Sequence, residues 1–414
     1  MKLSWSSAVG LHNPGSLPVQ KTLPAPAGQW GRIVQSSFRP HPLLSGAHLQ
    51  TLAQMLRPAP RLVLRRERLE LADGDFVDVG WSGDANAGGP LAVLIHGLAG
   101  GFESKYLLGT ASQLIALGWR TLILQLRGAG PEPNRLSRSY NQEDTEDLRY
   151  VWRLLREREP RTFIASVGWS LGGNVMLKAL AEEGDRAPID VAAAASVPFK
   201  IRPCIERLRR GFSRVYQKHL LGFLKEGLRR KHLRVALALP VNLPGALAAR
   251  SFLEYDVAYT APLAGYLDVE DYYTHASCGQ FLKDIRRATL VVHALDDPFM
   301  TDDIVPGVEA LSPQVTLEVA RSGGHVGFIS TGAFGQPYCW LERRLTQYLH
   351  GAFTLAKETP SGDGPHEGVG LNPRRASPRG RGRLVGVCGD SGGSHEVDGE
   401  RTALLETGSV RYPA

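Results

Sequence analysis

The chain has 414 residues, of which 43% are hydrophobic, 21% charged and 8% aromatic, and its formal net charge is +7. This composition is typical of a globular protein with a substantial buried core, and it excludes a fibrous or wholly disordered chain. No apolar stretch has the length of a membrane span, because Val191 to Phe199 is short and Val235 to Ala249 is interrupted by Pro240 and Pro244.

The sequence contains four widely spaced cysteines, Cys204, Cys278, Cys339 and Cys388. They have neither the C-x-x-C spacing of a zinc site nor that of a dense disulfide framework. The N-terminus lacks the apolar segment of a signal peptide, because His12 to Gly15 interrupt it. We therefore expect free thiols, a cytoplasmic location, and neither a metal ion nor a cofactor.

The first part of the chain predicts an arm and a β-hairpin. Residues 1–34 are rich in Pro, Gly and Ser without periodicity, and they predict a disordered arm. A short helix is expected over residues 47–56, before Pro58. Residues 61–71 and 76–81 carry regularly placed apolar side chains on either side of a turn and predict a hairpin.

Strands and helices alternate from Leu91 onward. Expected strands are residues 91–95, 119–124, 162–167, 190–196, 289–295 and 315–320. Expected helices are residues 107–117, 145–157, 171–183, 303–311 and 340–349. Such alternation predicts an α/β fold, with a mostly parallel sheet and helices on both faces.

The alternation stops between residues 197 and 288, which predicts an insertion. Within it Ile205, Leu208, Phe212 and Val215 recur at spacings of three and four, as in an amphipathic helix. We therefore divide the chain into a disordered arm (1–34), a first part of the α/β core (35–196), a helical cap (197–288), a second part of the core (289–352) and a disordered Gly/Arg/Pro-rich tail (353–414).

The insertion also carries a concentration of positive charge. Between Arg202 and Lys231 there are ten basic and two acidic residues, a net charge of +8. We give equal weight to two interpretations of this charge. The basic face is either solvated, or it meets an anionic membrane surface or an anionic substrate. Nucleic acid is not expected as a partner, because no nucleic-acid-binding module accompanies the charge. The oligomeric state stays open.

The residues Gly168-Trp169-Ser170-Leu171-Gly172 lie between an expected strand and an expected helix. This arrangement is the G-x-S-x-G nucleophile elbow of α/β-hydrolases. The strained turn needs a glycine at both ends, and it presents the Ser170 hydroxyl as a nucleophile. Leu171, at the start of the helix, has a free amide N–H that is suited to hold an oxyanion.

A serine nucleophile needs a base and an acid, and in α/β-hydrolases both follow it along the chain. His325 lies in a Gly-rich loop after a late strand and is the expected base. Asp297 lies at the end of the preceding strand and is the preferred acid, because Pro298 follows it, with Asp296 as the alternative. Loops outside the carboxyl ends of parallel strands are where ligands bind.

The second oxyanion donor is expected after the strand 91–95, where His96-Gly97-Leu98 begins a Gly-rich loop. Gly97 lets the backbone turn so that the amide of Leu98 faces Ser170. His96 is expected to fix this loop by hydrogen bonding rather than to act as a base.

These motifs resemble those of the YheT-like α/β-hydrolases, relatives of the animal abhydrolase-domain esterases and lipases. The resemblance is carried by His48 to Leu52, His96 to Leu98, Arg127-Gly128, Glu132 to Leu136, Ser139-Tyr140, Asp144 to Leu148, the elbow with Gly173-Asn174, Asp271 to Tyr273, Asp296 to Phe299 and Gly323 to Phe328. It covers about Phe38 to Gly351, and it implies a triad of Ser170, Asp297 and His325 that hydrolyses carboxylic esters.

We therefore expect a serine hydrolase that cleaves small-molecule carboxylic esters, with acyl or lipid-like substrates, through an acyl-enzyme. The alternatives are a thioesterase or acyltransferase with the same triad, and a non-catalytic ligand-binding protein on the same fold.

Overall fold

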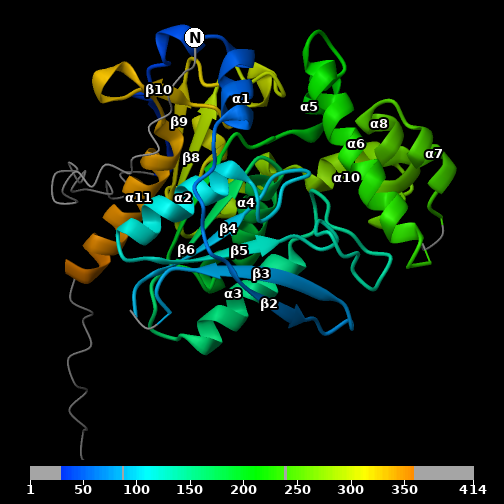
Figure 1. The fold of residues 1–414 in the computed structure, drawn as a ribbon, viewed down its shortest axis with the longest axis horizontal. Coiled ribbons are helices and arrows are strands. Elements are labelled where there is room, and N and C mark those ends of the chain that lie inside the picture. Colours follow the sequence, from blue (N-terminus) through cyan, green and yellow to red (C-terminus); the bar gives the residue numbers. More distant parts are fainter. Residues whose placement is uncertain (1–28, 86–87, 237–239, 359–414) are drawn as a thin grey trace, which may run out of the picture. The chain divides into compact units, whose positions relative to one another are not determined.

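A computed structural model describes residues 29–85, 88–236 and 240–358. Its centre is a nine-stranded sheet in the order β1-β9-β8-β7-β6-β4-β5-β3-β2, and β10 pairs separately with β11 (Figure 1). Every helix within these ranges is too short or too polar to span a membrane. The strands are β1 (Arg32–Gln35), β2 (Arg65–Glu70), β3 (Phe76–Ser82), β4 (Leu91–Ile95), β5 (Arg120–Gln125), β6 (Ile164–Trp169), β7 (Val191–Ala195), β8 (Ala288–Ala294), β9 (Val315–Ala320), β10 (Ile329–Thr331) and β11 (Pro337–Cys339).

Most of the sheet is parallel, which confirms the fold class expected from the alternation. The seven neighbouring strands β1, β9, β8, β7, β6, β4 and β5, in their order across the sheet, run parallel. β3 is antiparallel to both of its neighbours, β5 and β2. In the central pair, Ile95 of β4 lies opposite Gly168 of β6. The loops that follow these two strands therefore leave the sheet side by side.

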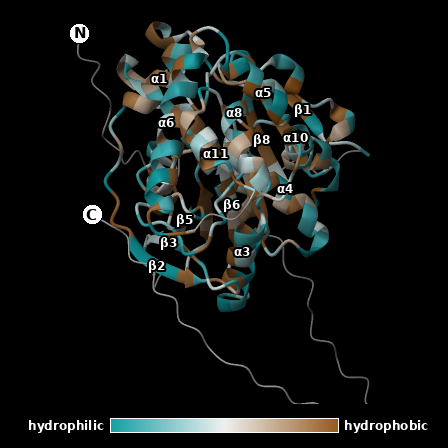
Figure 2. Ribbon diagram, turned by 90° about the vertical axis from the view of Figure 1, so that its right-hand side faces the viewer, coloured by the Kyte–Doolittle hydropathy of each residue, from teal (hydrophilic) through white to brown (hydrophobic). Residues whose placement is uncertain are grey.

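Helices cover both faces of the sheet. In β4, Val93 belongs to the core under α3 and α4, and Leu94 belongs to the core under α2 and α11. Both side chains are buried, as expected for a central parallel strand. Figure 2 shows hydrophobic residues along β8 and more hydrophilic ones along the outer strand β2. The helices of this part are α1 (Ala47–Leu56), α2 (Lys105–Ala116), α3 (Glu146–Arg158), α4 (Leu171–Glu183) and α11 (Trp340–Glu358).

The structure corrects the expected ends of the arm and of the tail. Residues 32–34 are not part of a disordered arm, because β1 pairs in parallel with β9 at the edge of the sheet. The tail does not begin at 353, because α11 continues to Glu358. The remainder of both segments, residues 1–28 and 359–414, lies outside the described residues.

The helix expected over 303–311 is also wrong. Its place is taken by two short 3-10 turns, Asp302–Ile304 and Val308–Ala310. Pro306 and Gly307 lie between them, and a proline followed by a glycine interrupts helical hydrogen bonding.

The inserted segment is helical and has a core of its own, which includes Tyr216, Leu228 and Tyr259. Leu98, after β4, and Phe299, after β8, pack against this core. The insertion therefore lies over the loops that follow these strands. Its elements are α5 (Ile201–Leu208), α6 (Ser213–His232), α7 (Leu243–Ala248), α8 (Phe252–Tyr255), a π-helical turn (Asp256–Thr260), α9 (Ala261–Leu263), α10 (Val269–Ala276) and a 3-10 segment (Cys278–Asp284).

The apolar stripe expected from Ile205 to Val215 is not one continuous face. Ile205 and Leu208 are buried in α5, whereas Phe212 and Val215 are exposed. α5 ends at Leu208, and Gly211, with φ of 54°, turns the chain before α6 begins. The stripe is therefore divided between two helices of different orientation.

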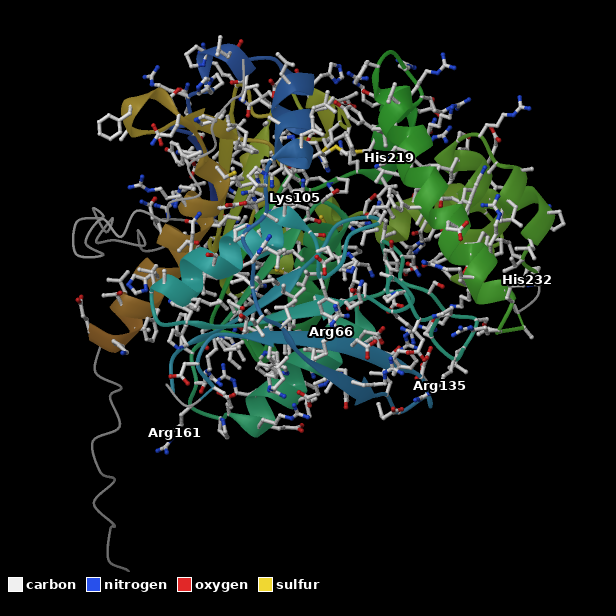
Figure 3. All side chains as sticks on the ribbon, viewed as in Figure 1. Arg66, Lys105, Arg135, Arg161, His219 and His232 are labelled. Atoms are coloured by element: carbon white, nitrogen blue, oxygen red, sulfur yellow. The ribbon has the colours of Figure 1, made fainter. Side chains whose placement is uncertain are left out.

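One cation of the expected basic face is buried. The Nζ of Lys231 donates to Asn134 Oδ1 at 2.8 Å and to Ser139 Oγ at 2.7 Å, and burial lowers the pKa of Lys231 to about 7. Lys231 thus attaches the end of α6 to the core, next to His232, which Figure 3 labels at the outer end of the same helix. The basic residues of α6 and of the turn before it that remain exposed are Arg209, Arg210, Arg214, Lys218, Arg229 and Arg230.

Candidate active site

Ser170 lies at the sharp turn between β6 and α4, in a backbone conformation with φ of 52° and ψ of −122°. Such a conformation is rare for residues other than glycine and costs on the order of 1–3 kcal/mol. Close packing holds it, because a Cβ added to Gly172 would lie 2.4 Å from the carbonyl oxygen of His96. The Ser170 N–H also donates to the carbonyl of Ala195 at 2.9 Å.

The structure brings Ser170, His325 and Asp297 into one hydrogen-bonded series. His325 Nε2 is 3.0 Å from Ser170 Oγ, and His325 Nδ1 is 2.8 Å from Asp297 Oδ2. The other oxygen, Oδ1, accepts the N–H of Phe299 at 2.9 Å. Asp297 is buried, and His325 is nearly so, so both carboxylate oxygens have fixed partners away from solvent.

The His325 ring is held on two sides. Its face stacks on Phe299, with ring centroids 3.9 Å apart and an interplanar angle of 6°. The backbone N–H of His325 donates to Thr51 Oγ1 on α1 at 2.9 Å. Next to it, Gln50 accepts the N–H of Ile329 at 2.6 Å. α1 therefore positions the loop that carries the histidine.

Asp296 has a different partner from Asp297. Its Oδ1 accepts the N–H of Gly324 at 2.9 Å, and burial raises the pKa of Asp296 above its ordinary value. Gly324 has φ of 61°, and a Cβ there would lie 2.4 Å from the carbonyl oxygen of Ala47. Asp296 thus shapes the Gly-rich loop, whereas Asp297 contacts the histidine.

Two backbone amides beside Ser170 are left without a hydrogen-bond partner among the described residues, those of Leu98 and Leu171. The amides on either side of Leu98 are hydrogen-bonded. Gly97 N–H donates to Tyr106 Oη at 2.9 Å, and Ala99 N–H donates to Tyr140 Oη at 3.1 Å. Leu98 and Leu171 both line the cavity that contains Ser170. Such N–H groups are available to a negatively charged oxygen.

His96 fixes the loop after β4. Its Nε2 accepts the N–H of Leu126 at 3.1 Å, so its Nδ1 carries the proton and donates to the carbonyl of Gly97 at 2.8 Å. His96 is fully buried, and burial lowers its pKa to about 4. This ring is therefore neutral, with both nitrogens occupied.

A cavity connects Ser170 to the cap. Its wall on the side of the core includes Leu98, Ser170, Leu171 and His325, and most of the remaining wall comes from the insertion. Among the described residues, no group of three or more His, Cys, Asp or Glu side chains is arranged to hold a metal ion. The cap side chains that line the cavity include Ile205, Leu220, Phe223, Leu224, Phe252, Tyr255, Asp256 and Tyr259.

Several residues of the site were assigned no role in the analysis of the sequence. Tyr106 and Tyr140 orient the loop after β4, and Phe299 and Thr51 position His325. Asn174 joins α4 to the insertion, because its amide donates to the carbonyl oxygens of Gln142 and Ala276. The resemblance to known motifs included Thr51, Tyr140, Asn174 and Phe299, and that was the signal available for them, whereas Tyr106 had none.

Comparison with known proteins gives a consistent result. Residues 90–331 match the family model described as alpha/beta hydrolase fold. The chain is 39% identical over 317 residues to "Putative esterase YheT" of Escherichia coli (strain K12), covering 76% of this chain and 93% of that protein. It is 28% identical to "Embryogenesis-associated protein EMB8" of Picea glauca, covering 75% and 72%, and 28% identical to "Phospholipase ABHD3" of Mus musculus, covering 71% and 74%.

Proposed function

Because this chain belongs to the alpha/beta hydrolase fold family, and within it to the group that includes Escherichia coli YheT, we propose that it is a serine hydrolase of carboxylic esters. The observation that carries the proposal is the series of hydrogen bonds from Ser170 Oγ through His325 to Asp297. A serine hydroxyl becomes an effective nucleophile when an oriented imidazole takes its proton.

The reaction proceeds in two halves. Ser170 Oγ attacks the ester carbonyl while His325 Nε2 takes the hydroxyl proton, and Asp297 stabilises the imidazolium that forms. The bond from the carbonyl carbon to the alcohol oxygen then breaks, and His325 gives its proton to the leaving alcohol. Water, activated by His325 in turn, hydrolyses the acyl-enzyme and regenerates Ser170.

The amides of Leu98 and Leu171 hold the oxyanion of each tetrahedral intermediate. This role is supported by their lack of other partners among the described residues and by their place in the wall of the cavity. Removing one donor of an oxyanion hole typically lowers kcat by about 10²–10³-fold. Because both groups belong to the backbone, their positions depend on the loop geometry that Gly97 and Gly172 permit.

The substrate is an ester with an apolar, lipid-like part. Support comes from the apolar cap side chains of the cavity, among them Leu220, Leu224 and Phe252. A relative whose name is phospholipase points in the same direction.

We extend the proposal to docking on an anionic membrane surface through α6. Phe212, at the N-cap of α6, and Val215 and Phe223 within the helix each have about half of their surface accessible, and Arg229 is exposed near its end. Apolar insertion combined with basic residues is suited to an anionic lipid surface. Phe223 also lines the cavity, so docking would bring the cavity next to the lipid.

The decisive experiment is the exchange Ser170→Ala. We expect it to abolish both the hydrolysis of p-nitrophenyl esters and the covalent labelling by a fluorophosphonate, with an unchanged circular dichroism spectrum. The matched control Ser82→Ala, at the end of β3 and away from the cavity, should retain both. Failure of the native protein to react with the fluorophosphonate would favour a non-catalytic binding protein on this fold.

A further inference from the structure

The cap end of the cavity contains a carboxylate that the proposed mechanism does not use. Asp256 opens the π-helical turn Asp256–Thr260 and lines the cavity. Its Oδ2 accepts the hydroxyl of Tyr273 at 2.9 Å, and the hydroxyl of Thr260 is its second hydrogen-bonding partner. π-helical turns are rare and occur frequently at functional sites.

In the part of the chain that the structure describes, Asp256 has no cationic partner. No Lys, Arg or His among the described residues forms an ion pair with it. Arg202, whose charge acts on the neighbouring Tyr273, is paired instead with Glu206 and Glu270. Carboxylates in such surroundings are rare unless a cation compensates them, so the missing partner is a feature of the site.

The groups that face Asp256 are phenols. Burial raises the pKa values of Tyr255, Tyr272 and Tyr273 above their ordinary value, so these rings are neutral at physiological pH. Burial also raises the pKa of Asp256, to about 6. At pH 8 the carboxylate is therefore ionised. Arg230 and Lys231 line the same cavity, and burial lowers the pKa of Lys231 to about 7.

Aromatic rings and an unused acceptor complete the surroundings. Tyr255 and Tyr259 lie with ring centroids 5.4 Å apart, Tyr272 and Tyr273 with centroids 5.6 Å apart, and all four line the cavity. Gln142 lines it too, and its buried Oε1 has no hydrogen-bond partner in the described part of the chain. Ring faces attract cations, and most strongly where water is excluded.

We propose that the Asp256 end of the cavity is a subsite for a cationic group of the substrate, of the ammonium class. The carboxylate supplies the counter-charge, and the tyrosine rings supply apolar and cation–π contact. This inference rests on the proposed function for its setting, because the subsite and Ser170 share one cavity. The ion pair that the chain lacks would thus form when substrate binds.

The test is binding without turnover. Choline and its uncharged isostere 3,3-dimethyl-1-butanol have the same shape and differ in charge, so their Kd values, measured by calorimetry, isolate the charge. At pH 8 we expect choline to bind at least about tenfold more tightly than the isostere. The preference should decline as the pH falls through about 6, because the protonated carboxyl group of Asp256 has no charge.

Variants locate the effect. Asp256→Asn keeps an acceptor for Tyr273 and should lower the preference several-fold, to what the tyrosine rings alone provide, whereas Tyr273→Phe keeps the charge and should retain the preference. The control Asp271→Asn removes an exposed carboxylate of α10 and should change nothing. If Asp256→Asn fails to fold, the pH titration is repeated with Lys231→Met, because Lys231 lines the same cavity and its pKa of about 7 would otherwise overlap with that of Asp256.

Two results would overturn the subsite: equal binding of choline and its isostere to the native protein at pH 8, or a preference that Asp256→Asn leaves intact. Both results come from binding measurements and do not depend on catalysis. A protein that binds choline in this way but hydrolyses no neutral ester would retain the subsite and refute the proposed function.

Discussion

The exchange Asp297→Asn would alter one atom at the buried end of the proposed triad. Oδ1 of Asp297 accepts the N–H of Phe299, and Oδ2 accepts from His325 Nδ1. The oxygen of an asparagine must stay with the Phe299 N–H, because its NH2 group cannot accept a hydrogen bond. The NH2 group therefore faces Nδ1, which has to be unprotonated to accept from it.

The histidine is then fixed in the wrong tautomer. With the proton on Nε2, His325 cannot take the proton of Ser170 Oγ, which lies 3.0 Å away. We expect kcat to fall on the order of 10⁴-fold, the loss that the same exchange causes in a serine protease triad. The side chain keeps its volume and its bond to Phe299, so the fold should persist.

Hydrolysis of p-nitrophenyl butyrate at pH 8 measures kcat, and thermal unfolding followed by circular dichroism verifies the fold. Asp296→Asn is the matched control. Its oxygen can still accept the N–H of Gly324, the bond that Asp296 makes now, so we expect a loss of less than about tenfold in activity. Equal losses in the two variants, or a larger loss for Asp296→Asn, would refute the argument from hydrogen-bond direction.

Two further predictions concern packing and docking. Gly172→Ala should lower the free energy of unfolding in urea by about 1–3 kcal/mol or more, because its Cβ would meet backbone oxygens of β4 and the following residue at 2.4–2.6 Å. Gly222→Ala in α6, where a Cβ meets nothing within 4 Å, should be neutral or stabilising. In sedimentation with vesicles at low salt, the protein should bind anionic but not zwitterionic lipid. Changing Arg229 and Arg230 to Gln should weaken this binding by about 2 kcal/mol, and binding that is independent of salt would contradict docking through charge.

The proposed triad was accessible from the sequence because each member lies at a local landmark. Ser170 follows a buried strand within a five-residue motif, and Asp297 and His325 follow later strands of the same sheet. Parallel strands present their carboxyl ends at one edge, so the order of elements was enough to bring the three together. The choice between Asp296 and Asp297 needed coordinates, since neighbouring residues point in different directions.

What the sequence could not supply depends on contacts between distant segments. β1 is short and follows a Pro/Gly-rich stretch, and it exists because β9 offers an edge with which to pair. Lys231 belonged to a basic run, but its position at the end of α6 places it against Asn134 of the core. Asp256 had no motif around it, and the absence of a counter-ion for it among residues 29–85, 88–236 and 240–358 becomes visible only when the chain is folded.

The site is assembled from segments that are remote along the chain. Ser170 and His325 are 155 residues apart, and Thr51, which holds the histidine loop, lies 274 residues before it. During synthesis the N-terminal part emerges first, so the nucleophile leaves the ribosome long before its base. A nascent chain that stalls within the cap carries Ser170 without His325, and the proposed ester hydrolysis would begin only after β9 has joined the sheet.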